Sequence, residues 1–130
     1  MEYKKDFDQW NKVKKQIDKQ NRVVFFYERE IWWCHMGTNV GSEEDGKGNL
    51  SLRPVLIYKK INKHTFIGMP LTRVLRDDKD HMPFYFNYDL NSIIISQLKI
   101  FDSKRLLKKM DTISTYLFKK IMKKAIAYLQ

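Results

Sequence analysis

Two neighbouring runs decide the fold of this chain: RPVLIY at residues 53–58 and IGMPLTR at residues 67–73. Each run is apolar, contains β-branched residues and has the length of a strand, and the polar residues 59–64 between them favour a hairpin. In an antiparallel hairpin the first strand starts beside the end of the second. Arg53 and Thr72 are therefore expected at one edge of the sheet, where the planar, two-pronged guanidinium suits a phosphate.

The composition indicates one folded domain, residues 1–130. Of its 130 residues, 43% are hydrophobic and 14% aromatic, which is enough for a single core but not for two. The single cysteine, Cys34, cannot form an internal disulfide. We expect no secretory signal, because no positively charged start is followed by an apolar run, and no apolar run approaches the roughly 20 residues needed to cross a membrane. We therefore expect a cytoplasmic protein with no membrane partner.

The formal net charge of +10 favours a polyanionic partner, and nucleic acid ahead of other classes. Much of the excess lies in residues 101–130, which hold 8 Lys and Arg against 2 Asp and Glu. The solvated face of a C-terminal helix would carry the same charges. The charge distribution alone therefore leaves both interpretations open.

Two stretches have the apolar periodicity of helices. The first, residues 6–20, starts at a capping Asp6, and the second, residues 114–129, starts at a capping Ser114. The apolar stripes of the two helices are Phe7, Trp10, Val13 and Ile17 in the first, and Leu117, Phe118, Ile121, Met122, Ala125, Ile126 and Leu129 in the second.

Most of the chain between these helices has the pattern of short strands. The expected strands are Ile31–His35, Leu52–Lys60, His64–Leu71, Phe84–Tyr88 and Ser92–Phe101. The glycine-rich residues Gly37–Ser51 predict a long loop, and Ser103–Met110 predicts a short helix or turn. Short strands with a helix at each end predict a mainly β fold, namely a small, strongly bent sheet or open barrel on which the helices pack.

Several short pieces, taken together, resemble a known protein family. They are REIWW at residues 29–33, GSE at 41–43, RPVL at 53–56, PLT at 70–72, SQLK at 96–99 and SKRL at 103–106. In this order and spacing they resemble the MazF/PemK family, the toxin endoribonucleases of bacterial toxin–antitoxin modules. The resemblance covers residues 28–130. It makes residues 1–27 an N-terminal helical extension beyond the shorter members.

The resemblance implies an SH3-like small open barrel of the MazF/PemK/CcdB type with a C-terminal helix. It further implies a homodimer that cuts single-stranded RNA without a metal or other cofactor. Arg53 and Thr72 fall on the family's catalytic arginine and threonine. Glu43 and Gln97 fall on positions that contact bases near the scissile bond.

The chain departs from the family in two places. The loop between Glu43 and Arg53 is longer than in compact members, so the base preference is open. Some relatives use an arginine and an aspartate just before the glutamine as an acid–base pair. Here those places hold Ile94 and Ser96, so that variant of the mechanism is not expected.

Other residues extend the predicted RNA-binding surface. Gln97 and Lys99 are expected on one face of a strand, where they suit a base edge and a phosphate respectively. Arg73 adds a cation beside Thr72. Of the adjacent tryptophans Trp32 and Trp33, one is expected in the core, and the other would suit base stacking or dimer packing equally well.

Cleavage of RNA needs positioning and charge stabilisation more than it needs a cofactor, because the 2′-OH is a built-in nucleophile. Arg53 would neutralise the charge that develops on the phosphate, and Thr72 would donate a hydrogen bond to it. Arginine remains protonated, so Glu43 or a nearby histidine is the candidate general base, and the sequence does not choose between them. The alternative for Arg53 is a surface ion pair with an acid of residues 42–46.

The cysteine and histidines do not have the spacing of a metal site. Cys34 and His35 are adjacent, while His64 and His81 lie far along the chain, which matches none of the usual zinc-ligand spacings. We predict no metal site. A solvated histidine is the simpler interpretation of His81, although a loop histidine can also touch RNA.

The sequence thus predicts a sequence-selective, metal-independent endoribonuclease that cleaves single-stranded mRNA and leaves 2′,3′-cyclic phosphate and 5′-OH ends. It would be the toxin of a type II toxin–antitoxin system, inhibited by an acidic, partly disordered antitoxin protein. One alternative is a non-catalytic, RNA-binding SH3-like module, against which the intact Arg53 and Thr72 argue. The other is a gyrase-targeting toxin on the same barrel. Such toxins act through a C-terminal tryptophan, which the closing AIAYLQ lacks.

Overall fold

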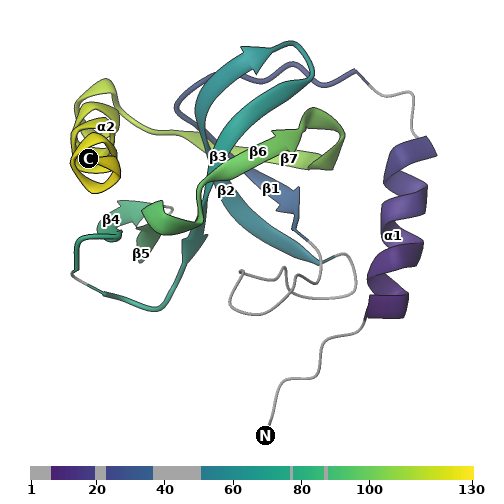
Figure 1. Cartoon of the computed structure of the whole chain (residues 1–130), viewed down its shortest axis with the longest axis horizontal. Helices are drawn as coiled ribbons and strands as arrows, with labels where there is room; N and C mark the ends of the chain where they lie inside the picture. The colour runs from purple at the N-terminus through teal and green to yellow at the C-terminus, as the bar shows by residue number, and fades with distance from the viewer. Residues whose placement is uncertain (1–6, 20–22, 37–50, 77, 87) are drawn as a thin grey trace, which may run out of the picture.

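The protein is a small, strongly curved antiparallel sheet with a helix near each end, as seen in a computed structural model that describes residues 7–19, 23–36, 51–76, 78–86 and 88–130 (Figure 1). In chain order the elements are α1 (Phe7–Lys19), β1 (Glu30–His35), β2 (Leu52–Asn62), β3 (Thr65–Thr72), β4 (His81–Phe86), β5 (Asp89–Ile94), the 3₁₀ turn η1 (Ile95–Gln97), β6 (Lys99–Asp102), the 3₁₀ turn η2 (Ser103–Arg105), β7 (Leu106–Thr112) and α2 (Thr115–Leu129). The predicted mainly β fold, a small open barrel with N- and C-terminal helices, is confirmed.

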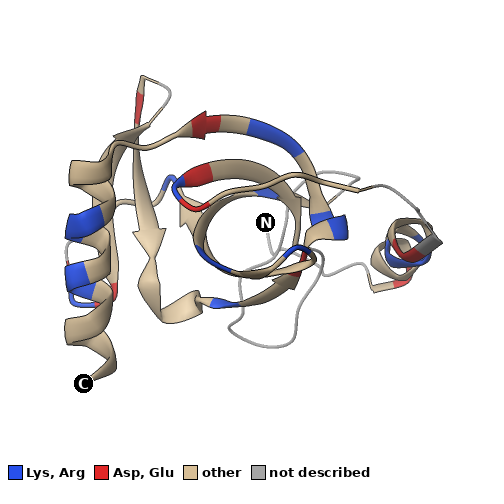
Figure 2. Cartoon of the chain, turned by 90° about the horizontal axis from the view of Figure 1, so that it is seen from above, with Lys and Arg blue, Asp and Glu red and all other residues tan. Residues whose placement is uncertain are grey.

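The strands follow the order β4-β5-β3-β2-β1-β7, and β6 pairs with β3 off this path. Viewed from above, the curled strands form a ring, with α2 on one side and α1 on the other (Figure 2). Among the described residues, no helix is both long and apolar enough to cross a membrane.

The curved sheet buries an apolar core on each of its faces. Side chains alternate along a strand, so β2 sends Val55 and Ile57 to one core and Leu56 to the other. The first core gathers Phe26, Trp32, Cys34, Met36, Val55, Ile57, Phe66, Phe101 and Leu106. The second lies between the sheet, the β4–β5 hairpin and α2, and includes Ile31, Leu56, Met69, Phe84, Ile93, Phe118 and Ile121.

The predicted hairpin of β2 and β3 is confirmed, with Val55 opposite Pro70 and Ile57 opposite Gly68. Gly68 also pairs on its other side with Lys99 of β6, so three strands meet at this glycine. A β-carbon added there would lie 2.6 Å from Val55 Cγ1 and 2.9 Å from ring atoms of Phe66 and Phe101. The close approach of these buried side chains therefore requires glycine.

The predicted single strand Ser92–Phe101 is wrong, because the chain divides into β5, η1 and β6. Leu71 of β3 pairs with Ile93. A continuous strand in that register would put Ser96 opposite Gly68, but Lys99 lies there. The intervening residues are taken up by the turn η1, which Leu98 N closes on Ile95 O at 3.2 Å.

The predicted short helix or turn at Ser103–Met110 is correct only for its first residues. After η2, the chain enters β7, which pairs antiparallel with β1, for example Trp33 with Lys108. The leucines and lysines of this segment have good helix propensity, but propensity is weak beside tertiary pairing. Burial of Leu106, with no exposed surface, fixes the start of the strand.

A buried carboxylate organises the turn that leads into β1. Glu30 is 6% exposed and accepts hydrogen bonds from Tyr27 N at 2.7 Å and Trp32 Nε1 at 3.1 Å. Lys109 Nζ lies 3.0 Å from its other oxygen. Arg29 adopts a positive φ of 76°, and its guanidinium donates to Ile113 O at 2.9 Å. These contacts attach the turn at the start of β1 to β7, and also to Ile113, the residue that follows β7.

The two helices begin and pack largely as the sequence indicates. Ser114 caps α2, since Leu117 N donates to Ser114 Oγ at 3.1 Å; Asp6 lies outside the described residues. The predicted stripes are wider than the buried faces. Phe7, Met122, Ile126 and Leu129 are exposed, whereas Trp10, Val13, Ile17, Phe118, Ile121 and Ala125 are buried.

Replacing Gly68 by alanine should destabilise the protein by about 1–3 kcal/mol, since the added methyl must displace buried side chains. The free energy of unfolding from urea titration, followed by circular dichroism, measures this. A variant within about 0.5 kcal/mol of the wild type would show that the three-strand contact is looser than the structure has it.

Candidate active site

Arg53 is held at the edge of the barrel by the strand beside it. The residue is 7% exposed, and its Nη1 donates to Leu71 O at 2.9 Å. This places the guanidinium at the end of β3, as the hairpin predicts. The alternative for Arg53, an ion pair with an acid of residues 42–46, involves residues outside the described part of the chain.

Thr72 ends β3 next to this guanidinium. Its hydroxyl oxygen accepts a hydrogen bond from Val74 N at 3.2 Å, which fixes the rotamer at the start of the following turn. A hydroxyl has one hydrogen to donate as well as lone pairs that accept. The Val74 bond uses an acceptor position, so the donor remains suited to an oxygen in the adjoining pocket.

A pocket of about 270 Å³ joins these two residues. The ends of β2 and β3 supply Arg53 and Thr72, and β1 supplies Trp33. The far wall comes from the β4–β5 hairpin, with Phe86 and Asp89. The prediction that one of the two tryptophans faces the core is confirmed, since Trp32 is 9% exposed. Trp33 instead brings an aromatic ring to the pocket.

Arg73 lies at the mouth of this pocket. It also lines the cavity, and its Nη2 is 3.4 Å from Asp89 Oδ2. The two side chains are 83% and 59% exposed, and an ion pair so open to water contributes little, about 1 kcal/mol or less. Arg73 therefore adds positive charge at the entrance without a rigid position.

The predicted grouping of Gln97 and Lys99 on one strand face is wrong. Gln97 lies in the turn η1 and Lys99 begins β6, and neither lines the pocket among its described residues. Lys99 Nζ instead lies 5.2 Å from the centre of the Phe101 ring. The sequence could not show this, because the offset between β5 and β6 is a tertiary feature. Glu43 lies outside the described residues.

Cys34 and His35 end β1 next to the arginine. Cys34 pairs with Arg53, and His35 with Leu52. Burial raises the pKa of the Cys34 thiol to about 12, although the nearby charges of Arg105 and Lys99 act in the opposite direction. A thiol that stays protonated is a poor nucleophile. Of these two residues, His35 therefore remains as the candidate base, and it pairs with Leu52, the neighbour of Arg53.

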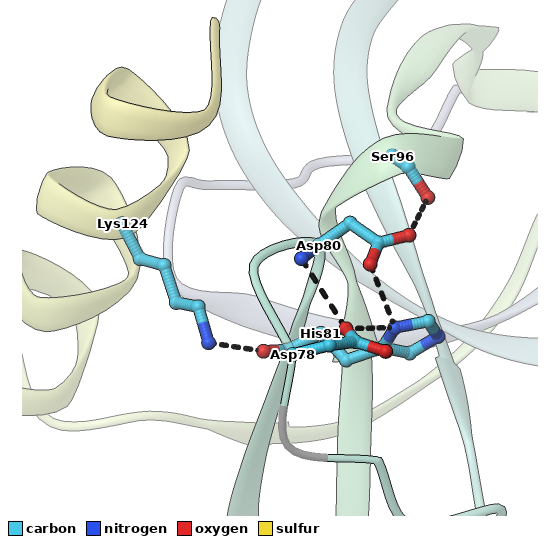
Figure 3. Close-up of polar contacts among 5 residues, drawn as sticks. All are labelled: Asp78, Asp80, His81, Ser96 and Lys124. Carbon is cyan, nitrogen blue, oxygen red and sulfur yellow. Dashed lines mark hydrogen bonds and ion pairs between the residues drawn. The ribbon is translucent and has the colours of Figure 1, made fainter.

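A second polar cluster was missed by the sequence analysis. His81 Nδ1 lies 2.7 Å from Asp78 Oδ1 and 3.3 Å from Asp80 Oδ1, and Ser96 Oγ donates to Asp80 Oδ2 at 2.9 Å (Figure 3). Lys124 of α2 reaches the backbone carbonyl of His81. The closeness of Asp78, Asp80 and His81 in the sequence could have indicated this cluster. Nothing in the sequence indicated the contact with Ser96.

This cluster, which we call the Asp80 clamp (Asp78, Asp80, His81, Ser96 and Lys124), joins the start of β4 to η1 and α2. Ligand atoms of its two aspartates and histidine lie within 4.8 Å of one another, the kind of group that can hold a metal ion. Its members already bond to one another, and they lie outside the Arg53 pocket among the described residues. We interpret the clamp as structural.

The pKa of Asp80 is lowered from 3.8 to about 2, first by hydrogen bonding with the Asp78 side chain, then with Ser96, with a smaller contribution from His81. A carboxylate with a depressed pKa stabilises the fold above its ordinary pKa, and this stabilisation is lost as the pH falls to its folded value. The contribution of Asp80 should therefore disappear between about pH 4 and pH 2.

Asp80→Asn should be less stable than the wild type at pH 5, and the gap in free energy of unfolding should close as the pH falls to 2. Ser96→Ala removes one of the hydrogen bonds to Asp80. When Asp80→Asn is made in this Ser96→Ala background, the loss of stability at pH 5 should be smaller but should not vanish. Urea titrations at several pH values measure both. A gap that is constant from pH 5 to pH 2 would contradict a stabilising Asp80 carboxylate.

Comparison with known proteins identifies the family of the chain. No curated protein sequence is similar enough to the chain to count as a match. One family model does match, over residues 27–129, and that family is described as PemK-like, MazF-like toxin of type II toxin-antitoxin system. The match includes the whole barrel and α2 and leaves out α1. The chain therefore belongs to the PemK-like, MazF-like family of type II toxin–antitoxin toxins.

Proposed function

We propose that the protein is a sequence-selective, metal-independent endoribonuclease that cleaves single-stranded mRNA as the toxin of its module. The observation that carries this is the Arg53 guanidinium, buried, bonded to Leu71 O and lining the same pocket as Thr72. Family membership supports the toxin role. The pocket supports the chemistry, because it sets a fixed cation beside a hydroxyl.

In the proposed reaction the 2′-oxygen of the RNA attacks the adjacent phosphorus. The new bond joins O2′ to phosphorus, the bond to O5′ breaks, and O5′ takes a proton from water, so the products carry a 2′,3′-cyclic phosphate and a 5′-OH. Negative charge grows on the non-bridging oxygens. Arg53 is placed to neutralise it, and because the Leu71 bond already orients the guanidinium, little reorganisation is needed during the reaction.

Thr72 is the second stabilising donor in this proposal. Its oxygen is held by Val74 N, which directs the hydroxyl hydrogen away from the backbone. A neutral hydroxyl gives a weaker hydrogen bond to an anion than a guanidinium does. Its contribution to the rate should accordingly be smaller than that of Arg53.

The proton of the 2′-OH must go to a base other than arginine, which stays protonated. Two candidates remain from the sequence, Glu43 and a histidine. Glu43 lies outside the described residues, and His35 is the histidine that pairs beside Arg53, through Leu52. His35 is 8% exposed, so as a base it would act through a small movement of β1 or through a bridging water.

Base recognition is proposed for the aromatic side of the pocket. Trp33 lines it, and a tryptophan ring beside a phosphate site is suited to stack on a base. Arg73 at the entrance would contact the RNA backbone. Glu43, Gln97 and Lys99 would meet bases or phosphates further along the strand.

The proposed assembly is a homodimer that an acidic antitoxin inhibits. Met122, Ile126 and Leu129 of α2 are exposed in the single chain, a stretch of apolar surface that a protein partner would cover. The net charge of +10 favours an acidic antitoxin segment, which could wrap a large surface as it orders.

Arg53→Ala should slow RNA cleavage by about 10²–10³-fold or more while the protein stays folded, because it removes charge stabilisation in the transition state. Thr72→Val, nearly isosteric, should lose less. Arg76→Ala is the matched control, since Arg76 is exposed in the β3–β4 connection, and its rate should stay within a few-fold of wild type. If Arg53→Ala keeps the wild-type rate, or unfolds the chain, Arg53 is structural and this proposal fails.

A further inference from the structure

A second pocket lies between α1 and η2. Its volume is about 390 Å³. One wall is a face of α1 that includes Trp10 and Asn11, and the other is formed by the residues that lead into β7. α1 lies outside the part of the chain that matches the family model, so this pocket is a feature of the N-terminal extension.

The lining of this α1–η2 pocket is predominantly basic. Its charged residues are Lys14, Lys15, Asp18, Asp102, Lys104 and Arg105. Asp102 is already engaged, because its carboxylate accepts the Lys104 backbone N–H at 2.8 Å. Among the described residues, neither acid forms an ion pair with these lysines or with the arginine. The pocket therefore keeps a net positive charge.

The ring of Trp10 contacts two of the cations that line the pocket. Trp10 is 5% exposed, with Arg105 Cζ 5.5 Å and Lys14 Nζ 6.0 Å from the ring centre. Arg105 Nη1 also donates to His35 O at 3.3 Å. A guanidinium held by a ring and a carbonyl is oriented before any ligand arrives, which lowers the entropy lost on binding. Its remaining N–H donors suit a phosphate.

The pocket is close to the candidate active site along the sheet. Leu106, next to Arg105, pairs with Cys34 of β1, and Cys34 pairs with Arg53 of β2. The backbones of Leu106 and Arg53 are therefore separated by two β-strand spacings of about 4.8 Å, or roughly 10 Å in all. An RNA strand bound in the Arg53 pocket would need to extend only a short way to reach the α1–η2 pocket.

We propose that the α1–η2 pocket binds backbone phosphate of the same RNA strand that enters the Arg53 pocket. This inference rests on the proposed function for its choice of ligand. Lys14, Lys15 and Lys104 supply further cations around an oriented Arg105, an arrangement suited to successive phosphates. RNA is favoured over an acidic peptide because the pocket lies within reach of a strand held at Arg53.

The test compares the wild type with the double variant Lys14→Gln/Lys104→Gln. The probes are uncleavable 2′-O-methyl oligonucleotides of about 4 and about 12 nucleotides, both within the range of site sizes of single-strand binders. Fluorescence anisotropy at several salt concentrations gives the affinities. The variant should lose about 10-fold in affinity for the longer probe and much less for the shorter. Its slope of log affinity against log salt should fall by about 0.7 for each lysine that contacts a phosphate.

The matched control is Lys119→Gln/Lys123→Gln, which removes the same charge from the exposed face of α2 and should bind both probes as the wild type does. Asn11→Glu, which puts an acid into the pocket, should weaken binding of the longer probe as the lysine variant does. Circular dichroism confirms that each variant is folded. Equal losses in the control, or no loss in either pocket variant, would overturn the proposal.

Two further results separate this inference from the proposed function. If the wild type cleaves no RNA but the pocket variants still lose affinity for the longer probe, the nuclease proposal fails and the phosphate site stands. If the pocket variants keep RNA affinity but lose binding of a polyglutamate peptide, the pocket serves an acidic protein partner and the phosphate site is overturned.

Discussion

The antiparallel pairing of β2 with β3 is the constraint on which the rest of the structure depends. At its centre Gly68 allows β2, β3 and β6 to meet around the side chains of Val55 and Phe101, closer than any other residue would permit. At its end the same pairing sets Arg53 against Leu71 O. A packing requirement in the core thus fixes the position of the cation that the proposed chemistry needs.

The features that the sequence revealed are local ones. Two apolar runs separated by polar residues predicted the hairpin, and with it the meeting of Arg53 and Thr72 in one pocket. Apolar periodicity predicted both helices, and Ser114 was recognisable as a cap because capping depends on residues three positions apart. Trp32 and Trp33 were correctly expected to differ in burial, since alternate residues of a strand face opposite sides.

The features that the sequence did not reveal depend on pairing between distant segments. The β-branched run at 93–95 favours a continuous strand, yet β3 pairs with β5 and β6 in registers that differ, and η1 absorbs the difference. This displaced Gln97 and Lys99 from their predicted face. The contact of Ser96 with Asp80 and the pocket between Trp10 and Arg105 likewise join elements far apart in the chain. The periodicity of apolar residues in the sequence gives no indication of such contacts.

The central claim is that cleavage uses the 2′-OH of the RNA as the nucleophile and a fixed guanidinium as the main charge stabiliser, with no metal ion. The most direct measurement is analysis of the fragment ends after brief incubation of the protein with mixed RNA in EDTA. The account predicts that cutting proceeds, that each cut leaves a 5′-OH and a 2′,3′-cyclic phosphate or its opened 3′-phosphate, and that a 2′-deoxy residue before the cut abolishes it. Cutting that stops in EDTA, or persists on the deoxy substrate, would contradict it.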